Sequence, residues 1–322
     1  MIAPGPDLED LKGFESAFKF ESIPEIEVPT NNGQANKAPS LSPGLKLARV
    51  TLLSVFIFSL SLVLELTVVS SVQQRSVQQR LFEQFRKDLA IGTAPVGTTD
   101  SEGMPLKAGS PVAYIEIPSI GLSQVVVEGT SSENLLNGPG HRRDSPLPGQ
   151  EGVSVLMGRR ATFGGPFSEI HKLHPGALIK LTTGQGEFSY KVSGVRQEGD
   201  LAPGPLDSGS ARLLLATAGG MPFLPSGVVR VDADLSGSAL GATSPIYDNS
   251  TLPKAEQMMA GDSGTLWALA LWMQCLLLLV LAAIWAWYKL GRARAWVLFL
   301  PPLLLVGLNA AGETARLLPN LL

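Results

Sequence analysis

The stretch VAYIEIPSIGLSQVVVEG, residues 112–129, reads as two β-strands that meet at Gly121. Its β-branched side chains half-alternate with polar ones, which is the period of a strand with one buried face. Further stretches of this kind follow, each bounded by Gly, Pro or Ser. They are GVSVLM (152–157), ALIKLTT (177–183), EFSYKVSGV (187–195), ARLLLATA (211–218) and GVVRVDADL (227–235). Short strands at this spacing predict a single β-barrel or sandwich over residues 111–236.

Composition agrees with a β domain attached to membrane segments. The chain has 322 residues, of which 45% are hydrophobic and only 16% charged, a balance typical of chains with membrane spans. Its 34 Gly and 24 Pro favour a loop-rich, mainly β domain. The net charge of −3 argues against nucleic-acid binding, which needs a concentrated basic surface. Cys275 is the single cysteine, so an intrachain disulfide is excluded.

Three apolar runs flank the predicted β domain and are long enough to cross about 30 Å of hydrocarbon. They divide the chain into segments in this order: a disordered cytoplasmic tail (1–48), the first transmembrane helix (49–72), a stalk and linker (73–110), the β domain (111–236), a linker (237–264), the second (265–288) and third (295–311) transmembrane helices and an extracytoplasmic tail (312–322). We therefore expect a mainly β domain anchored by one N-terminal and two C-terminal transmembrane helices.

Basic residues orient these spans. Lys46 and Arg49 precede the first span, and the turn 289–294 between the other two is basic. Positive charge stays on the cytoplasmic side, which predicts a multi-pass cell-membrane protein with its β domain outside. Pro301-Pro302 should break the third span, and Glu65 in the first span either has a partner within the bilayer or lies near enough to the interface to stay wet. These features suit a subunit of a larger membrane assembly.

The N-terminal tail contains one periodic feature. Leu8, Leu11, Phe14 and Phe18 recur at helical spacing among charged residues. Two interpretations stay open: a fluctuating segment with no role, or a docking peptide for a cytoplasmic partner.

Seven short motifs in the β domain occur in an order that matches one family. They are IPSIGL (117–122), GPGH (138–141) followed by PLPG (146–149), GRR (158–160), PF (166–167) followed by Ile170, Leu173 and Gly176, FSYKV (188–192), LLLATA (213–218) and RVDA (230–233). In these motifs the domain resembles a sortase, a thiol transpeptidase of Gram-positive surfaces, of the class C, D or E kind. The resemblance covers this domain only, and it implies an eight-stranded sortase-like β-barrel.

Carried over position by position, the resemblance puts the wrong residues at the catalytic positions. The family's nucleophilic cysteine falls on Ala218 and its histidine on Arg159, whereas its arginine is retained as Arg230. The family's Asn before the His strand is replaced by Val153. Alanine cannot form a thioester, and arginine stays protonated and cannot donate its proton to a leaving amine.

Neighbouring residues do not restore that chemistry. Thr217 adjoins the vacant position but needs a base within hydrogen-bond reach, and His141 is a candidate only because it lies in the family's GPGH segment. His171 and His174 are one helical turn apart, but no carboxylate or cysteine completes a metal site at ligand spacing. We interpret them, and Arg142-Arg143, as solvated surface, and we predict no cofactor.

The sequence thus predicts a pseudo-sortase in a cell-envelope assembly, with other membrane-protein subunits as partners. Its groove would bind a sorting-signal-like or acidic peptide through five residues: Arg230, Arg159, Arg160, Thr217 and His141. The alternatives are an active transpeptidase or hydrolase with displaced catalytic groups, and an engineered inactive sortase. The further departures at Val153 and Gly219-Gly220 favour natural degeneration over engineering. Whether the groove is open stays undecided.

Overall fold

The computed structural model describes residues 43–100 and 102–322, and the periodic segment around Leu8 to Phe18 lies outside that range. Residues Leu47–Leu322 form one compact unit, which holds every strand of the described residues. The helices are α1 (Pro43–Leu64), the π-helix η1 (Glu65–Val69), α2 (Ser70–Ile91), α3 (Leu266–Leu290) and α4 (Arg292–Leu317). Single 3-10 turns occur at Pro118–Ile120, Asn134–Leu136, Ile170–Lys172, Lys254–Glu256 and Ser263–Thr265.

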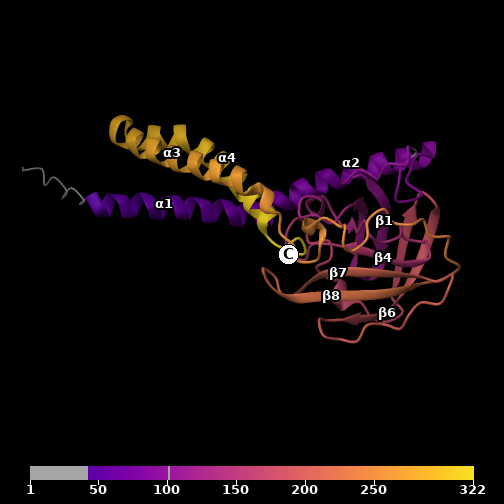
Figure 1. Cartoon of the computed structure of the whole chain (residues 1–322). Helices are drawn as coiled ribbons and strands as arrows, with labels where there is room; N and C mark the ends of the chain where they lie inside the picture. Colours follow the sequence, from indigo (N-terminus) through magenta and orange to yellow (C-terminus); the bar gives the residue numbers. More distant parts are fainter. Residues whose placement is uncertain (1–42, 101) are drawn as a thin grey trace, which may run out of the picture. The chain divides into compact units, whose positions relative to one another are not determined.

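Eight strands close into a barrel, as the sequence predicts (Figure 1). They are β1 (Pro111–Ile117), β2 (Leu122–Glu128), β3 (Gly140–His141), β4 (Gly152–Met157), β5 (Leu178–Thr183), β6 (Gly186–Arg196), β7 (Ala211–Met221) and β8 (Leu224–Leu235). Their order around the barrel is β1-β2-β3-β4-β7-β8-β6-β5. Two neighbouring pairs, β2 with β3 and β4 with β7, are parallel, and the other pairs are antiparallel. Only the two-residue strand β3 was not predicted, because two residues carry no period.

Alternation along the strands supplies the barrel core. Ile115, Ile117, Ile179, Leu181 and Leu213 are fully buried members of one apolar cluster. Their neighbours in sequence point outward, as in β5, where buried and exposed residues alternate. Each large aliphatic side chain buried this way contributes roughly 1.5–3 kcal/mol, so the strand period fixes the register of the sheet.

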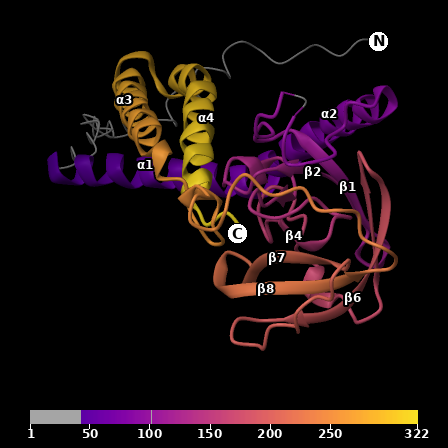
Figure 2. The same ribbon diagram turned by 45° about the vertical axis from the view of Figure 1, so that its right-hand side comes forward.

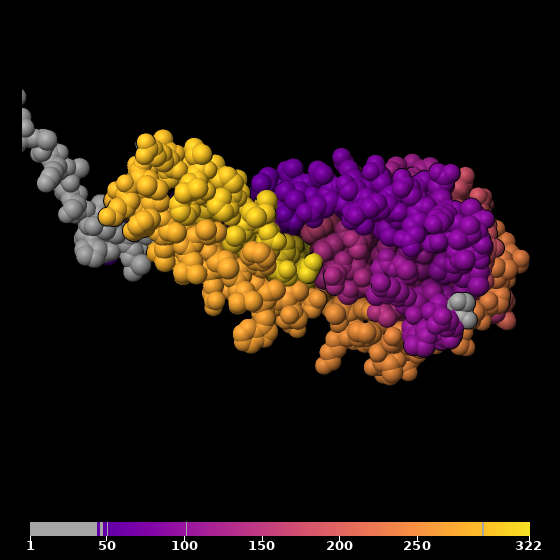
Figure 3. Space-filling model, turned by 90° about the horizontal axis from the view of Figure 1, so that it is seen from above, coloured from indigo at the N-terminus to yellow at the C-terminus, as the bar shows by residue number. Residues whose placement is uncertain are grey.

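The segment 73–110, expected to be a stalk and linker, is packed on the barrel. The Gln78 side chain donates to the carbonyls of Val125 and Asn137 (3.0 and 2.7 Å) and accepts from the Val125 N–H (2.7 Å). Phe85, two turns later, is 1% exposed. Figure 3 shows the indigo atoms of α2 lying along the barrel. Helix α2 therefore packs on the barrel and hydrogen-bonds to its backbone. It does not form a stalk that holds the barrel out in solvent.

Within the described part of the chain, three helices are long and apolar enough to cross a membrane, at Thr51–Ile91, Ser263–Leu290 and Ala293–Leu317. α3 and α4 lie side by side and antiparallel (Figure 2), and Gly291 alone connects them. Leu276, Val280 and Leu303 form a buried cluster between them, against which Ile57 and Phe58 of α1 pack.

The third span differs from the sequence expectations in two ways. The third span, predicted over 295–311, runs from Arg292 to Leu317, and Pro301-Pro302 lies within the continuous helix. Because packing against α3 holds the helix on both sides of the prolines, the lost hydrogen bonds do not end it. Glu65 is buried and begins the single π-helical turn, and it shares a pocket with Gly312, Glu313 and Arg316 of α4.

Candidate functional site

Parallel pairing of β4 with β7 brings the 158–160 loop beside residues 217–218. Met157 lies opposite Ala216, the Gly158 N–H donates to the Ala216 carbonyl (3.0 Å), and the Thr217 hydroxyl donates to the Gly158 carbonyl (2.8 Å). Thr217 is only 1% exposed. Its proton is engaged by a backbone carbonyl and its oxygen is out of reach of solvent. Thr217 is therefore part of the barrel wall and cannot act as a displaced nucleophile or as a direct peptide contact.

Ala218 and Arg230 lie on adjacent strands at the same end of the barrel. Ala218 pairs with Val228 and Ala216 with Arg230. Ala218 is fully buried, and its carbonyl accepts a 2.8 Å hydrogen bond from the Arg160 guanidinium. The Arg230 side chain is half-buried, and within residues 43–100 and 102–322 its one hydrogen-bond partner is the Met258 sulfur at 4.0 Å. Sulfur is a weak acceptor, so the Arg230 charge is available to another group.

Arg159 is fully buried inside a polar cage. Its guanidinium donates to the Thr162 hydroxyl (3.0 Å) and to the carbonyl and hydroxyl of Ser132 (3.1 and 2.7 Å), and it lies 5.1 Å from the centre of the Phe163 ring. Its Nε has no acceptor, and no carboxylate among the described residues forms an ion pair with it. Burial lowers the pKa of Arg159 to about 10. The group still carries its proton at pH 7 and is not a general acid or base there.

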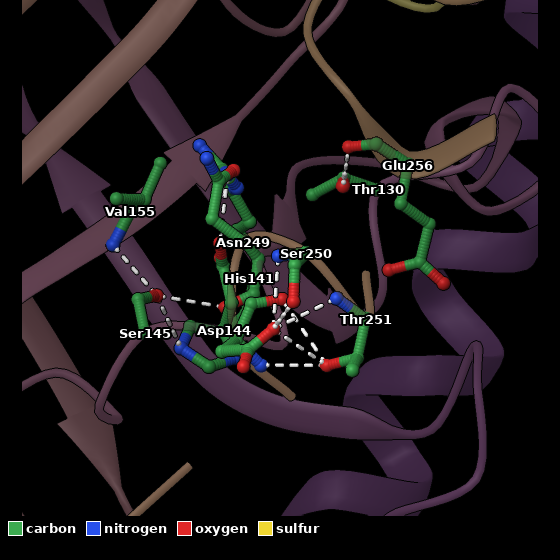
Figure 4. Close-up of polar contacts among 11 residues, drawn as sticks. Thr130, His141, Asp144, Ser145, Val155, Asn249, Ser250, Thr251 and Glu256 are labelled. Carbon is green, nitrogen blue, oxygen red and sulfur yellow. Dashed lines mark hydrogen bonds and ion pairs between the residues drawn. The ribbon is translucent and has the colours of Figure 1, made fainter. Parts of the chain in front are cut away.

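His141 does not contact Thr217 or Arg159, and it is a structural residue. Its Nδ1 lies 2.9 Å from a Glu128 carboxylate oxygen, and its Nε2 lies 3.0 Å from the Pro146 carbonyl and 3.2 Å from the Ser145 hydroxyl. Figure 4 shows His141 and Ser145 together with the Val155 N–H that donates to the Ser145 hydroxyl. A carbonyl can only accept, so Nε2 carries a hydrogen and cannot take one from Ser145. The expectation that His141 lines the binding groove is wrong.

The residues Arg142 and Arg143, expected to be solvated, attach the segment 237–264 to the barrel. Arg142 donates to Asp144 (2.7 Å) and Asn249 (2.8 Å), and Arg143 forms a forked ion pair with the Glu256 carboxylate. Thr130 adds a 2.7 Å bond to the Glu256 carbonyl, which Figure 4 also shows. This segment thus folds over one end of the barrel. His171 and His174, by contrast, are exposed, and no metal-ligating cluster occurs within the described part of the chain.

The end of the barrel that carries Ala218 is filled by apolar side chains. Seven residues form one buried cluster: Leu135, Val155, Met157, Ala216, Ala218, Val228 and Leu321. Met258 and Met259 of the covering segment pack against it. Met259 adopts a positive φ of 63°, as does Phe163 beside Arg159 at 51°, a conformation that side-chain-bearing residues rarely adopt. The groove that the sequence left undecided is therefore occupied in this structure, by residues that sequence patterns placed in a linker and a tail.

Comparison with known proteins identifies the barrel. A family model described as "Sortase domain" matches residues 115–220, which run from β1 to the end of β7. The barrel is a sortase domain. Arg159, Thr217 and Ala218 lie inside the matched residues of the sortase domain, and Arg230 lies beyond them.

Individual sortases are similar over part of the chain. Sortase D of Bacillus subtilis is 35% identical over 86 residues, and this chain spans 42% of its length. Among solved structures, a Clostridium perfringens sortase D5 transpeptidase is 23% identical with a TM-score of 0.39, and covers 50% of this chain and 99% of its own. Sortase E of Streptomyces avermitilis is 25% identical with a TM-score of 0.35, over 47% of this chain and 100% of its own.

Proposed function

We propose that this membrane-anchored sortase-like protein binds peptides or proteins without cleaving them, as a subunit of an assembly in the cell envelope of a Gram-positive bacterium. One observation carries the proposal. The position at which the resemblance places the nucleophile is Ala218, and the single cysteine of the chain, Cys275, lies in α3, among the apolar helices. Thioester formation needs a thiolate at the barrel.

The surroundings of Ala218 support the loss of chemistry. Arg159 stands where the family's histidine is expected, and its two terminal nitrogens donate to Thr162 and Ser132. Thr217 donates to a backbone carbonyl and is buried, and no base contacts it among the described residues. The alternative of an active transpeptidase with displaced groups therefore gains no support from either residue.

A binding role remains open to Arg230. Its guanidinium is half-buried and, among the residues that the structure describes, hydrogen-bonds only to a thioether, so an acidic or carboxylate-bearing peptide could form a charge-assisted hydrogen bond with it. Charge around the helices supports the proposed topology. Lys46 and Arg49 precede the first span, and Lys289 and Arg294 flank Gly291, which favours a cytoplasmic location for both regions and an external barrel.

The test uses the full chain in detergent micelles. Incubated with sorting-signal peptides and an amine acceptor, the chain should show no turnover above a buffer blank. An intact cysteine sortase serves as the positive control. Removing a nucleophile alone lowers turnover by about 10⁶-fold in other hydrolases. Turnover that disappears in the variants Thr217→Val or Arg230→Gln would overturn the proposal.

Binding is tested separately on the same preparation. A carboxylate-rich peptide should bind more weakly to Arg230→Gln, whereas Lys191→Gln, which removes an exposed charge on β6, is the matched control. Equal affinity for both variants would remove Arg230 from the binding role.

A further inference from the structure

The residues that follow α4 turn into the barrel. α4 ends at Leu317, Leu318 is extended (φ −64°, ψ 152°), and Pro319 cannot continue a helix. Asn320 and Leu321 are 0% exposed and Leu322 is 4% exposed. Figures 1 and 2 show the end of the chain, marked C, next to the barrel. We call residues 318–322 the strap. The sequence placed them in a free extracytoplasmic tail, whereas they are among the most deeply buried residues of the protein.

Backbone hydrogen bonds hold the strap from two sides. On one side, the Arg160 N–H donates to the Leu321 carbonyl (3.0 Å), and the N–H groups of Ala161 and Thr162 donate to the Leu322 carbonyl oxygen (2.9 and 3.2 Å). On the other side, the Asn320 N–H donates to the Ala260 carbonyl at 2.8 Å. Within the strap, the Leu322 N–H donates to the Pro319 carbonyl at 3.0 Å. The strap is therefore bound as a turn between the 158–162 loop and the covering segment.

Side chains of the strap are recognised as well. The Asn320 amide donates to the carbonyls of Thr130 (2.8 Å) and Gln257 (2.9 Å). Leu321 belongs to the buried cluster that contains Ala216 and Ala218. Together these contacts make a site for an Asn-Leu peptide. The site offers an apolar pocket to the leucine side chain, two carbonyls to the asparagine amide and a row of N–H donors to the peptide backbone.

From these contacts we infer that the strap is a ligand in cis, which occupies a peptide-binding site at Ala218, and that this site accepts a peptide in trans only when the strap leaves. The inference does not depend on whether the sortase domain has catalytic activity. It identifies an occupant and a recognition chemistry for the filled end of the barrel.

The strap is tied closely to α4. Only Leu318 and Pro319 separate the end of that helix from Asn320, and two residues span at most about 7 Å when fully extended. A larger displacement of α4 must withdraw Asn320 and Leu321 from their sites. Access to the site is therefore coupled to the position of a membrane helix.

Accessibility of position 218 tests the inference on the full chain. In a Cys275→Ser background, Ala218→Cys places a reporter thiol in the cluster, and a membrane-impermeant maleimide measures its exposure. We expect slow labelling in this chain and at least a tenfold faster rate after Leu321→Asp, or after truncation behind Leu317. Leu201→Cys, at a position that is 94% exposed, is the control whose rate stays unchanged. Equal rates at position 218 with and without an intact strap would overturn the inference.

Two further measurements separate release of the strap from loss of the fold. In Leu321→Asp, hydrogen exchange should accelerate at the Arg160, Ala161 and Thr162 amides and stay slow at Leu213 and Leu215 in the barrel. Acceleration throughout the barrel would instead show that the strap is a fixed part of the core. An end-capped peptide with the sequence of residues 317–322 should slow labelling of the truncated chain, and the same peptide with Asp in place of Leu321 should not. If neither peptide slows labelling, the strap is not a ligand for this site.

Discussion

The Arg143 guanidinium and the Glu256 carboxylate form a forked ion pair between two segments that lie 113 residues apart. Glu256 is only 2% exposed and Arg143 is partly buried. The pair closes the covering segment 237–264 over the barrel, next to Thr130 and Asn320.

Removing one partner of this pair should destabilise the domain strongly. In Arg143→Met the buried Glu256 carboxylate loses its counter-charge, and such losses cost about 3–5 kcal/mol in the free energy of unfolding. The exposed pair Lys172 and Glu169 provides the control, because surface pairs contribute about 0–1 kcal/mol. Urea unfolding of Arg143→Met and Lys172→Met measures both. A similar small effect in the two variants would contradict the structural role of the buried pair.

Stability should fall as pH rises through the titration of His141. Burial alone would lower the pKa of His141, but the charge and hydrogen bond of Glu128 outweigh burial, and the pKa is raised above 6.5. A raised folded-state pKa contributes stability that is fully present below the unfolded-state value and is lost above the folded-state value.

Thermal unfolding between pH 5.5 and 9 measures this dependence. The melting temperature of the native chain should fall over that range more than that of His141→Gln. His171→Gln removes an exposed histidine, and it should keep the native profile. A native profile that matches His141→Gln would exclude His141 as the titrating group.

Two arginines should respond in opposite ways to replacement by methionine. Arg159 has no carboxylate partner among the described residues, so Arg159→Met removes a buried charge and should leave the free energy of unfolding unchanged or raise it by about 1 kcal/mol. Arg196 holds Asp232, which is 4% exposed, through bonds of 2.5 and 3.2 Å. Arg196→Met should lower the free energy of unfolding by about 3–5 kcal/mol. A loss of that size for Arg159→Met would mean that its cage stabilises the fold.

Gly307 allows α4 to approach α1. A Cβ at this position would overlap the Ser61 hydroxyl, whereas a Cβ at Gly312 would meet only Glu65, at 3.9 Å. Gly307→Val should therefore separate the helices and lower stability by about 1–3 kcal/mol, and Gly312→Ala should not. Cross-linking between cysteines introduced on the facing surfaces of α1 and α4 measures the separation. Equal yields in the two glycine variants would contradict close packing at Gly307.

Sequence patterns predicted the barrel well because its strands carry a period of two over several residues, as in ALIKLTT and FSYKV. They could not predict what covers the barrel. The segment 237–264 is rich in Gly, Ser and Pro and has no period, so nothing local indicated that Arg143 binds Glu256 across the fold. The strap resembles a tail in sequence because five residues show no periodicity, although Leu321-Leu322 after a helix is more apolar than a solvated tail requires.

The candidate site, like the fold, could be predicted only in part. The resemblance placed Arg159, Ala218 and Arg230 by order in the chain, and strand pairing brings the backbones of β4, β7 and β8 together. The direction of each side chain is a tertiary property. The Arg159 side chain points into the cage of Ser132 and Thr162, and the His141 side chain points towards Glu128. These contacts do not follow from spacing along the sequence.

The position of the strap has a consequence for biosynthesis. A chain made from its amino end releases the strands β1–β8 well before α3, α4 and residues 318–322, and domains generally begin to fold as they emerge. The cluster around Ala218 lacks Leu321 until then. The packing of the barrel would therefore remain unfinished until α3, α4 and the strap have been made, and a chain that stops before the strap would carry an incompletely packed domain, open to proteolysis.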